Sequence, residues 1–100
     1  MNPSATTFFN SHLTDLKNEY STICEEIESH KQKADITSHL HGDKEYYQLC
    51  INKWEIFIDI KRTEAILKGK EYDFIKYHKP VALNKIQRLN DLRNHVGDHI

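Results

Sequence analysis

The fold of this chain is decided by the stretch FFNSHLTDLKNEYSTICEEI, residues 8–27. Its apolar residues follow one another at steps of four, three, four, three and four: Phe9, Leu13, Leu16, Tyr20, Ile23 and Ile27. Residues so spaced lie on one face of an α-helix, and a regular four-three alternation is typical of the seam between packed helices. The pattern predicts a long first helix over residues 4–34, with Pro3 at its entry and Ser4 or Thr6 as its cap.

Residues 44–68 form the second predicted helix and the most apolar segment of the chain. Its apolar side chains fall on all sides of a helix: Tyr46, Tyr47, Leu49, Cys50, Ile51, Trp54, Ile56, Phe57, Ile58 and Ile60. Such a helix is expected to be the most buried element. Residues 54–60 also alternate like a strand, but the chain offers no second strand-like segment to pair with them. A helix is therefore predicted, capped by Asp43 and ended by Gly69.

A short helix is expected over residues 70–79. Pro80 should break it and open the last helix, because proline has no backbone N–H and suits a first helical turn. The last helix carries apolar residues at helical spacing: Leu83, Ile86, Leu89, Leu92 and Val96. The sequence thus predicts a single all-α domain over residues 1–100, a small bundle of three long helices plus a short helix before Pro80, with Trp54 and Phe57 in its core.

The composition is that of a folded domain. Apolar residues make up 38% and charged residues 29% of the 100 residues, which is enough for one core. No apolar run approaches the roughly 20 residues of a transmembrane helix, and the N-terminus has no signal-peptide pattern, so a cytoplasmic protein is predicted. Cys24 and Cys50 are not in a C-x-x-C pair. We expect two buried reduced thiols, with a disulfide between the first two helices as the alternative.

The charges are divided unevenly along the chain. Residues 1–60 hold 5 Lys and 10 Asp or Glu, a net charge of −5, whereas residues 61–100 hold 9 Lys or Arg and 5 Asp or Glu, a net charge of +4. One interpretation is that the two parts pair with each other or are simply solvated. The other is that the basic part contacts nucleic acid or an acidic protein. If the basic part contacts nucleic acid, the expected phosphate-binding residues are Lys76, Lys79, Lys85 and Arg88.

Few sequence features indicate catalysis. With three glycines, the chain contains no phosphate-binding or dinucleotide-binding loop, and no small-molecule substrate is indicated. Seven histidines include the pairs His39–His41 and His95–His99, and the second pair has the spacing of metal ligands on a helix. We expect solvated histidines, with no metal ion and no cofactor.

The residues Arg93, Asn94 and His99 match an R-N-x4-H pattern that resembles the HEPN ribonucleases. That resemblance implies a helical domain that dimerises so that arginine and histidine line a cleft. The arginine would hold phosphate and the histidine would act on the ribose 2′-OH. This is the enzymatic alternative, and the other interpretation is the frayed end of the last helix.

A longer resemblance covers residues 71–90. The pattern E-x2-F-x-K-x2-K-P, followed by L-x-K-[LI] and an asparagine, is met by Glu71, Phe74, Lys76, Lys79, Pro80, Leu83, Lys85, Ile86 and Asn90. It resembles the front part of the RteC family, regulators associated with conjugative tetracycline-resistance elements. The family usually has two adjacent aromatics where this chain has Phe74 and Ile75, its members are longer, and their DNA-binding region lies beyond the matched part.

The RteC resemblance implies a non-enzymatic regulatory or assembly module. Its expected partner is another protein or a second copy bound through the first helix, whose apolar seam is long. Weak contact with DNA is a further expectation. The remaining alternative is a helical interaction domain with an unspecified partner.

Overall fold

The computed structural model of the protein describes residues 2–36 and 42–98. Its elements are α1 (Pro3–Lys33), α2 (Lys44–Lys68), α3 (Glu71–Asp73), a π-helical turn η2 (Phe74–His78) and α4 (Lys79–Asp98). No strand occurs within these two ranges, so the predicted all-α fold is confirmed and residues 54–60 are helical. None of the described helices combines the length and apolar composition needed to cross a membrane.

Local signals set the ends of the two long helices. Asn2 caps α1, since its Oδ1 accepts a hydrogen bond of 2.8 Å from the Ala5 N–H. Neither Ser4 nor Thr6 is the cap, because Pro3 already occupies the first helical position and the cap is the residue before it. Asp43 caps α2 by accepting from the Tyr46 N–H at 2.8 Å, and Gly69 ends it with φ +67°, both as predicted.

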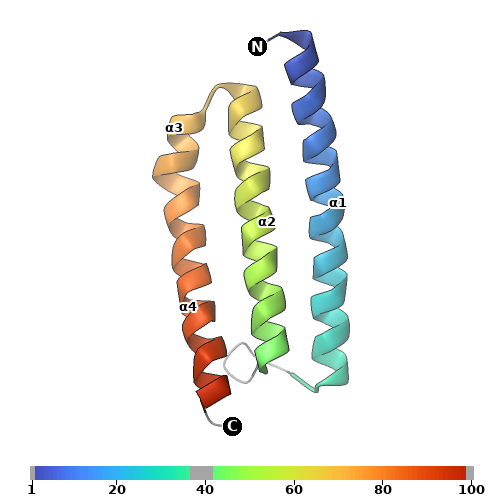
Figure 1. Ribbon diagram of the computed structural model, residues 1–100, viewed down its shortest axis with the longest axis vertical. Coiled ribbons are helices and arrows are strands. Elements are labelled where there is room, and N and C mark those ends of the chain that lie inside the picture. The colour runs from blue at the N-terminus through green and yellow to red at the C-terminus, as the bar shows by residue number, and fades with distance from the viewer. Residues whose placement is uncertain (1, 37–41, 99–100) are drawn as a thin grey trace.

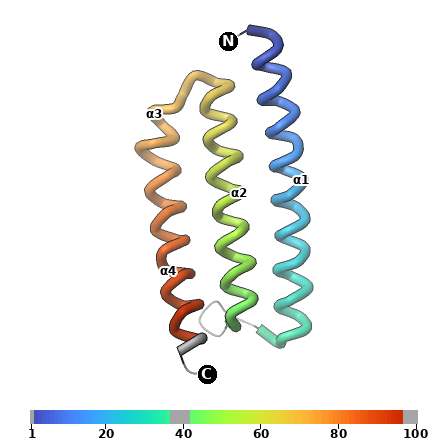
Figure 2. Tube along the Cα trace, viewed as in Figure 1, coloured from blue at the N-terminus to red at the C-terminus, as the bar shows by residue number. Residues whose placement is uncertain are grey.

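The three long helices lie side by side, with α2 in the middle (Figures 1 and 2). The Cα trace measures 52 × 26 × 18 Å. Helix α2 packs against both α1 and α4, while those two make little contact with each other. The all-round apolar α2 thereby obtains a cover on two sides, and α1 and α4 each keep an uncovered outer side.

The core has two parts. The lower part, at the bottom of the view in Figure 1, joins α1, α2 and α4. It consists of Ile23, Ile27, Ile36, Tyr46, Tyr47, Cys50, Ile51 and Leu89. The upper part joins α2, η2 and α4 through Ile58, Ala65, Phe74 and Ala82. Every residue of the α1 apolar ladder is buried or half-buried, as the spacing predicts. The expectation for Trp54 and Phe57 needs correction, because both are half-buried and line the core rather than fill it.

The chain stays helical through Pro80. The expected short helix before Pro80 is present as α3 and η2, but η2 continues directly into α4, so the corner expected at Pro80 does not form. The Lys79 N–H donates to the Phe74 carbonyl, five residues back. Proline cannot donate to the carbonyl four residues before it and its ring crowds that carbonyl, and a wider turn relieves both problems.

Removing side-chain volume from the middle of α2 should destabilise the whole domain. Ile51 is 3% exposed in the lower core. Ile51→Ala should lower the free energy of unfolding by about 2–5 kcal/mol, because it leaves a cavity among packed neighbours. Urea titration followed by circular dichroism measures this. Glu55→Ala, an exposed position one turn further along α2, should change stability by less than about 0.5 kcal/mol. Equal effects of the two variants would contradict the assigned core.

Candidate functional site

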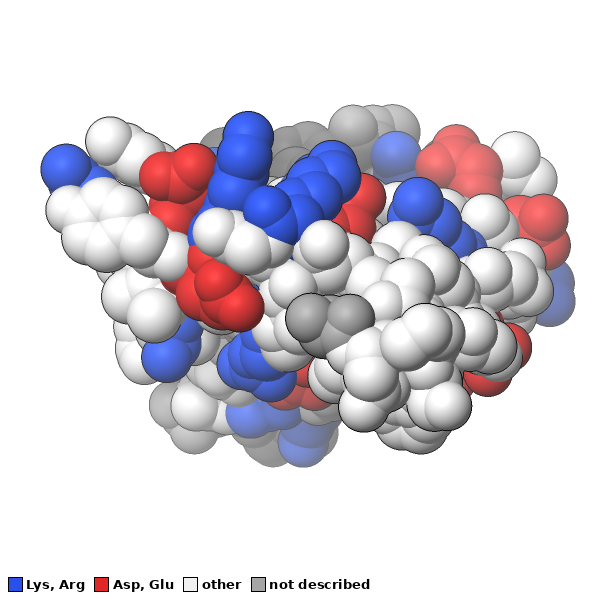
Figure 3. Space-filling view, turned by 90° about the horizontal axis from the view of Figure 1, so that it is seen from above, with Lys and Arg blue, Asp and Glu red and all other residues white. Residues whose placement is uncertain are grey.

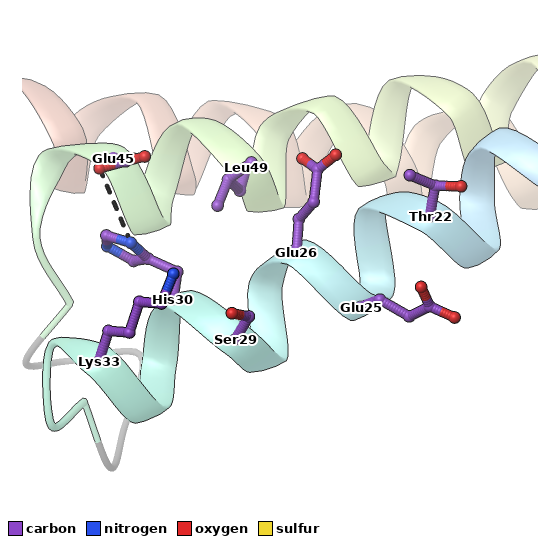
Figure 4. Close-up of a pocket in the computed structure, with 8 residues that line it drawn as sticks. All are labelled: Thr22, Glu25, Glu26, Ser29, His30, Lys33, Glu45 and Leu49. Atoms are coloured by element: carbon purple, nitrogen blue, oxygen red, sulfur yellow. Dashed lines mark ion pairs between the residues drawn. The ribbon is translucent and has the colours of Figure 1, made fainter.

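A long groove runs between α1 and α2. Its lower part has a volume of about 430 Å³ and is lined by Thr22, Glu25, Glu26, Ser29, His30, Lys33, Glu45 and Leu49 (Figure 4). A second hollow of about 380 Å³ is lined by Asn18, Glu19, Thr22, Ile23, Glu26 and Ile56. Thr22 and Glu26 line both hollows. The two hollows are therefore parts of one surface, which we call the acidic groove.

The acidic groove combines an apolar base with a negative rim. Leu49 and Ile56 of α2 are half-buried and seven residues apart, so they lie on the same side of that helix. Four glutamates line the groove, against one lysine and one histidine: Glu19, Glu25, Glu26 and Glu45. Apolar area with carboxylates around it suits a basic amphipathic segment.

His30 closes the lower end of the acidic groove. Its Nε2 lies 2.9 Å and 3.0 Å from the two carboxylate oxygens of Asp43, and its Nδ1 lies 3.7 Å from Glu45. These contacts tie the end of α1 to the start of α2. Within residues 2–36 and 42–98, no three His, Cys, Asp or Glu side chains are grouped so that they could hold a metal ion.

The residues of the predicted ribonuclease motif do not form a described cleft. Arg93 is half-buried and donates from Nη1 to Oε1 of Gln48 on α2. Gln48 in turn donates to Asn52 at 2.9 Å. Arg93 therefore helps to hold α4 against α2, while Asn94 is exposed. His99 lies outside the described residues, as do His39 and His41.

The four predicted phosphate-binding residues are exposed but spread over α4 and η2. Within the part of the chain that the structure describes, none of Lys76, Lys79, Lys85 and Arg88 takes part in an ion pair. The alternative that they pair with the glutamates of α1 is therefore not observed. At roughly 100° per residue, Lys79 and Arg88 point to opposite sides of α4, whereas Lys85 and Arg88 share one side.

Two tyrosines that sequence reasoning missed surround Lys76. Its Nζ lies 5.5 Å from the centroid of the Tyr72 ring and 5.3 Å from that of the Tyr77 ring. The spacing of Tyr72 and Lys76, four residues apart on a helix, could have indicated this contact. The groove residues Glu45, Leu49 and Ile56 were also missed, because their partners on α1 are distant in sequence.

The two cysteines are free and differ in their surroundings. Cys24 is half-buried and Cys50 is buried beside Tyr46. Burial raises the pKa of the Cys50 thiol, and the hydrogen bond with Tyr46 and the nearby Lys53 and Lys31 offset only part of that rise. Neither cysteine forms a disulfide in the structure, and Cys24 is less covered than predicted.

Comparison of the chain with protein-family models, with curated proteins and with solved structures gave no match. Function must therefore be argued from the residues of this chain.

The pKa of Asp43 should give the domain an acid-sensitive contact. Burial raises this pKa, but the hydrogen bond from the Tyr46 amide and the contacts with His30 outweigh burial, so the pKa lies below its ordinary value of 3.8. The carboxylate thus stabilises the fold above about pH 4, and this contribution is lost as the pH falls further. Urea midpoints measured across this range should fall less steeply for Asp43→Asn than for the unmodified protein. Glu25→Gln, which replaces an exposed carboxyl group outside the His30–Asp43 contact, should leave the slope unchanged.

Thiol labelling should separate the two cysteines. Cys24 is expected to react with a disulfide reagent at a measurable rate in the folded protein. Cys50 should react only on unfolding, because burial keeps it protonated and covered. The Cys24→Ser variant isolates Cys50 for this measurement. Rapid labelling of that variant under native conditions would show that Cys50 is accessible.

Proposed function

We propose that the protein is a non-enzymatic helical assembly module that associates with a second copy of itself. The observation that carries this proposal is the acidic groove. Between Asn18 and Lys33 it follows α1 for roughly 22 Å, since a helix rises about 1.5 Å per residue. That length accommodates several turns of a docked helix. A regulatory or assembly role also agrees with what the resemblance of residues 71–90 to RteC-like regulators implies.

The complementary surface lies on the opposite edge of the molecule. Six large apolar residues of the described chain are exposed: Phe8, Tyr72, Ile75, Tyr77, Val81 and Leu83. Five of these six follow one another along α3, η2 and the start of α4, which α2 covers from one side only. This edge is therefore the main uncovered apolar surface.

Val81, Lys85 and Arg88 form the part of this edge that suits the acidic groove. They are spaced four and three residues apart and so lie on one side of α4. Val81 is 53% exposed and supplies apolar area, and the two cations have no acidic partner within the described chain. A helix that presents an apolar anchor beside cations fits a groove with an apolar base and a rim of glutamates.

A second copy is the occupant because this chain supplies both surfaces. The acidic groove belongs to the half with net charge −5, and Lys85 and Arg88 belong to the half with net charge +4. Opposite charges at a contact accelerate association and favour the correct partner. The apolar seam of α1 is covered by α2, so α1 contributes the glutamates that line the acidic groove rather than the seam.

Charge reversal provides the test. Sedimentation at tens of micromolar protein and low salt should give the mass of a homodimer or larger homo-oligomer. Lys85→Glu with Arg88→Glu should yield monomers, and Glu19→Lys with Glu26→Lys should do the same, because each pair of changes opposes like charges. An equimolar mixture of the two variants should associate again, since each supplies the charge that the other has lost.

The control is Glu55→Lys, an exposed residue of α2 outside the groove, which should still associate. A monomeric unmodified protein would refute the proposal. Failure of the mixed variants to associate would show that other surfaces make the contact.

A further inference from the structure

The end of the molecule where α2 meets α3 carries exposed rings and lysines together. Tyr72 is 68% and Tyr77 is 56% exposed, and Lys76 lies between their rings. Seen from above, Lys and Arg side chains lie over α3 and the end of α2, with Asp and Glu side chains among them (Figure 3). Packing of the fold does not require either ring, because both remain mostly outside it.

A hollow beside these rings adds further cations. It has a volume of about 270 Å³ and is lined by Lys61, Glu64, Ala65, Lys68, Lys70, Asp73, Phe74 and His78. Lys61 pairs with Glu64 at 3.4 Å. Lys68 and Lys70 are exposed and form no ion pair in the described part of the chain. Two of its lining residues, Asp73 and His78, directly follow Tyr72 and Tyr77 in the sequence.

We infer that this basic–aromatic end, made of Lys68, Lys70, Tyr72, Lys76 and Tyr77, binds single-stranded nucleic acid. The two tyrosine rings stack on bases, and the three lysines contact phosphates. Exposed rings interleaved with cations are the combination that holds single strands without sequence preference. The inference is independent of the assembly proposal, which uses Lys85 and Arg88 further along α4.

Stacking on the tyrosine rings favours a single strand over a duplex. A base must be unpaired and accessible before a tyrosine can stack on its face, and the bases of a duplex already stack on one another. Neither stacking nor phosphate contact requires the ribose 2′-OH, so DNA and RNA strands bind alike. Glu71 and Asp73 lie in the same segment and oppose the phosphate charge. Binding is therefore salt-sensitive and of moderate strength.

Fluorescence anisotropy with a labelled oligothymidylate of about 20 nucleotides tests this inference. The unmodified protein should bind it at about 20 mM salt, and more tightly than the corresponding duplex, with strong weakening toward about 150 mM. Tyr72→Ala with Tyr77→Ala should weaken binding roughly 30-fold, from the loss of two stacked bases. Tyr72→Phe with Tyr77→Phe should retain binding, because a phenyl ring still stacks.

The lysines are tested by the salt dependence. Lys68→Ala with Lys70→Ala should weaken binding and reduce the slope of log affinity against log salt by about 1.4, from two lost phosphate contacts. The controls are Lys44→Ala, an exposed lysine at the opposite end, and Ile75→Ala, an exposed neighbour without a ring. These controls should bind like the unmodified protein.

Three outcomes would overturn the inference. They are the absence of binding at low salt, duplex binding as tight as single-strand binding, and unchanged affinity after both tyrosines are replaced by alanine. Circular dichroism of each variant establishes that its helices are intact, which is expected because all the changed residues are exposed. The Lys85→Glu, Arg88→Glu variant should still bind through the basic–aromatic end of the monomer, with at most a modest loss of affinity from its changed net charge. This result would distinguish the nucleic-acid-binding surface from the assembly surface.

Discussion

Burial of α2 between α1 and α4 is the constraint on which the rest of the structure depends. A helix that is apolar on all sides needs neighbours on more than one side, and only α1 and the α3–α4 segment are long enough to provide them. Because both neighbours pack on α2 rather than on each other, each keeps an outer side free for other contacts. The outer side of α1 carries glutamates, and that of α4 carries lysine and arginine side chains.

Polar contacts at the lower end fix how the helices meet. The Gly42 N–H donates a hydrogen bond of 3.1 Å to the hydroxyl oxygen of Tyr47. This gives the buried hydroxyl a partner, since Tyr47 is only 1% exposed. A side chain at Gly42 would also meet the ring of Tyr46, so the close approach there requires glycine. His30 and Asp43 link the end of α1 to the cap of α2. Of these contacts, the one between His30 and Asp43 joins α1 to α2 at the lower end of the acidic groove.

The two proposed surfaces use different parts of one basic segment. Lys85 and Arg88 lie midway along α4, whereas Tyr72, Lys76 and Tyr77 of the basic–aromatic end precede Pro80 on the continuous helical segment formed by α3, η2 and α4. Because α3, η2 and α4 are continuous, these two parts lie along one helix axis. A break in the helix at Pro80 would have changed the direction of one part relative to the other. An assembled pair would then carry two nucleic-acid-binding ends.

The sequence by itself determined the helices. The α1 ladder, the Asp43 cap and the left-handed Gly69 are local features, because hydrogen bonds and backbone angles within a few residues decide them. Tertiary structure alone decided the half-burial of Trp54 and the use of Arg93 to hold Gln48. Each of these depends on which residues of a neighbouring helix a side chain contacts. The acidic groove is of the same kind, since Leu49 and Ile56 join the α1 glutamates only when two helices distant in sequence pack together.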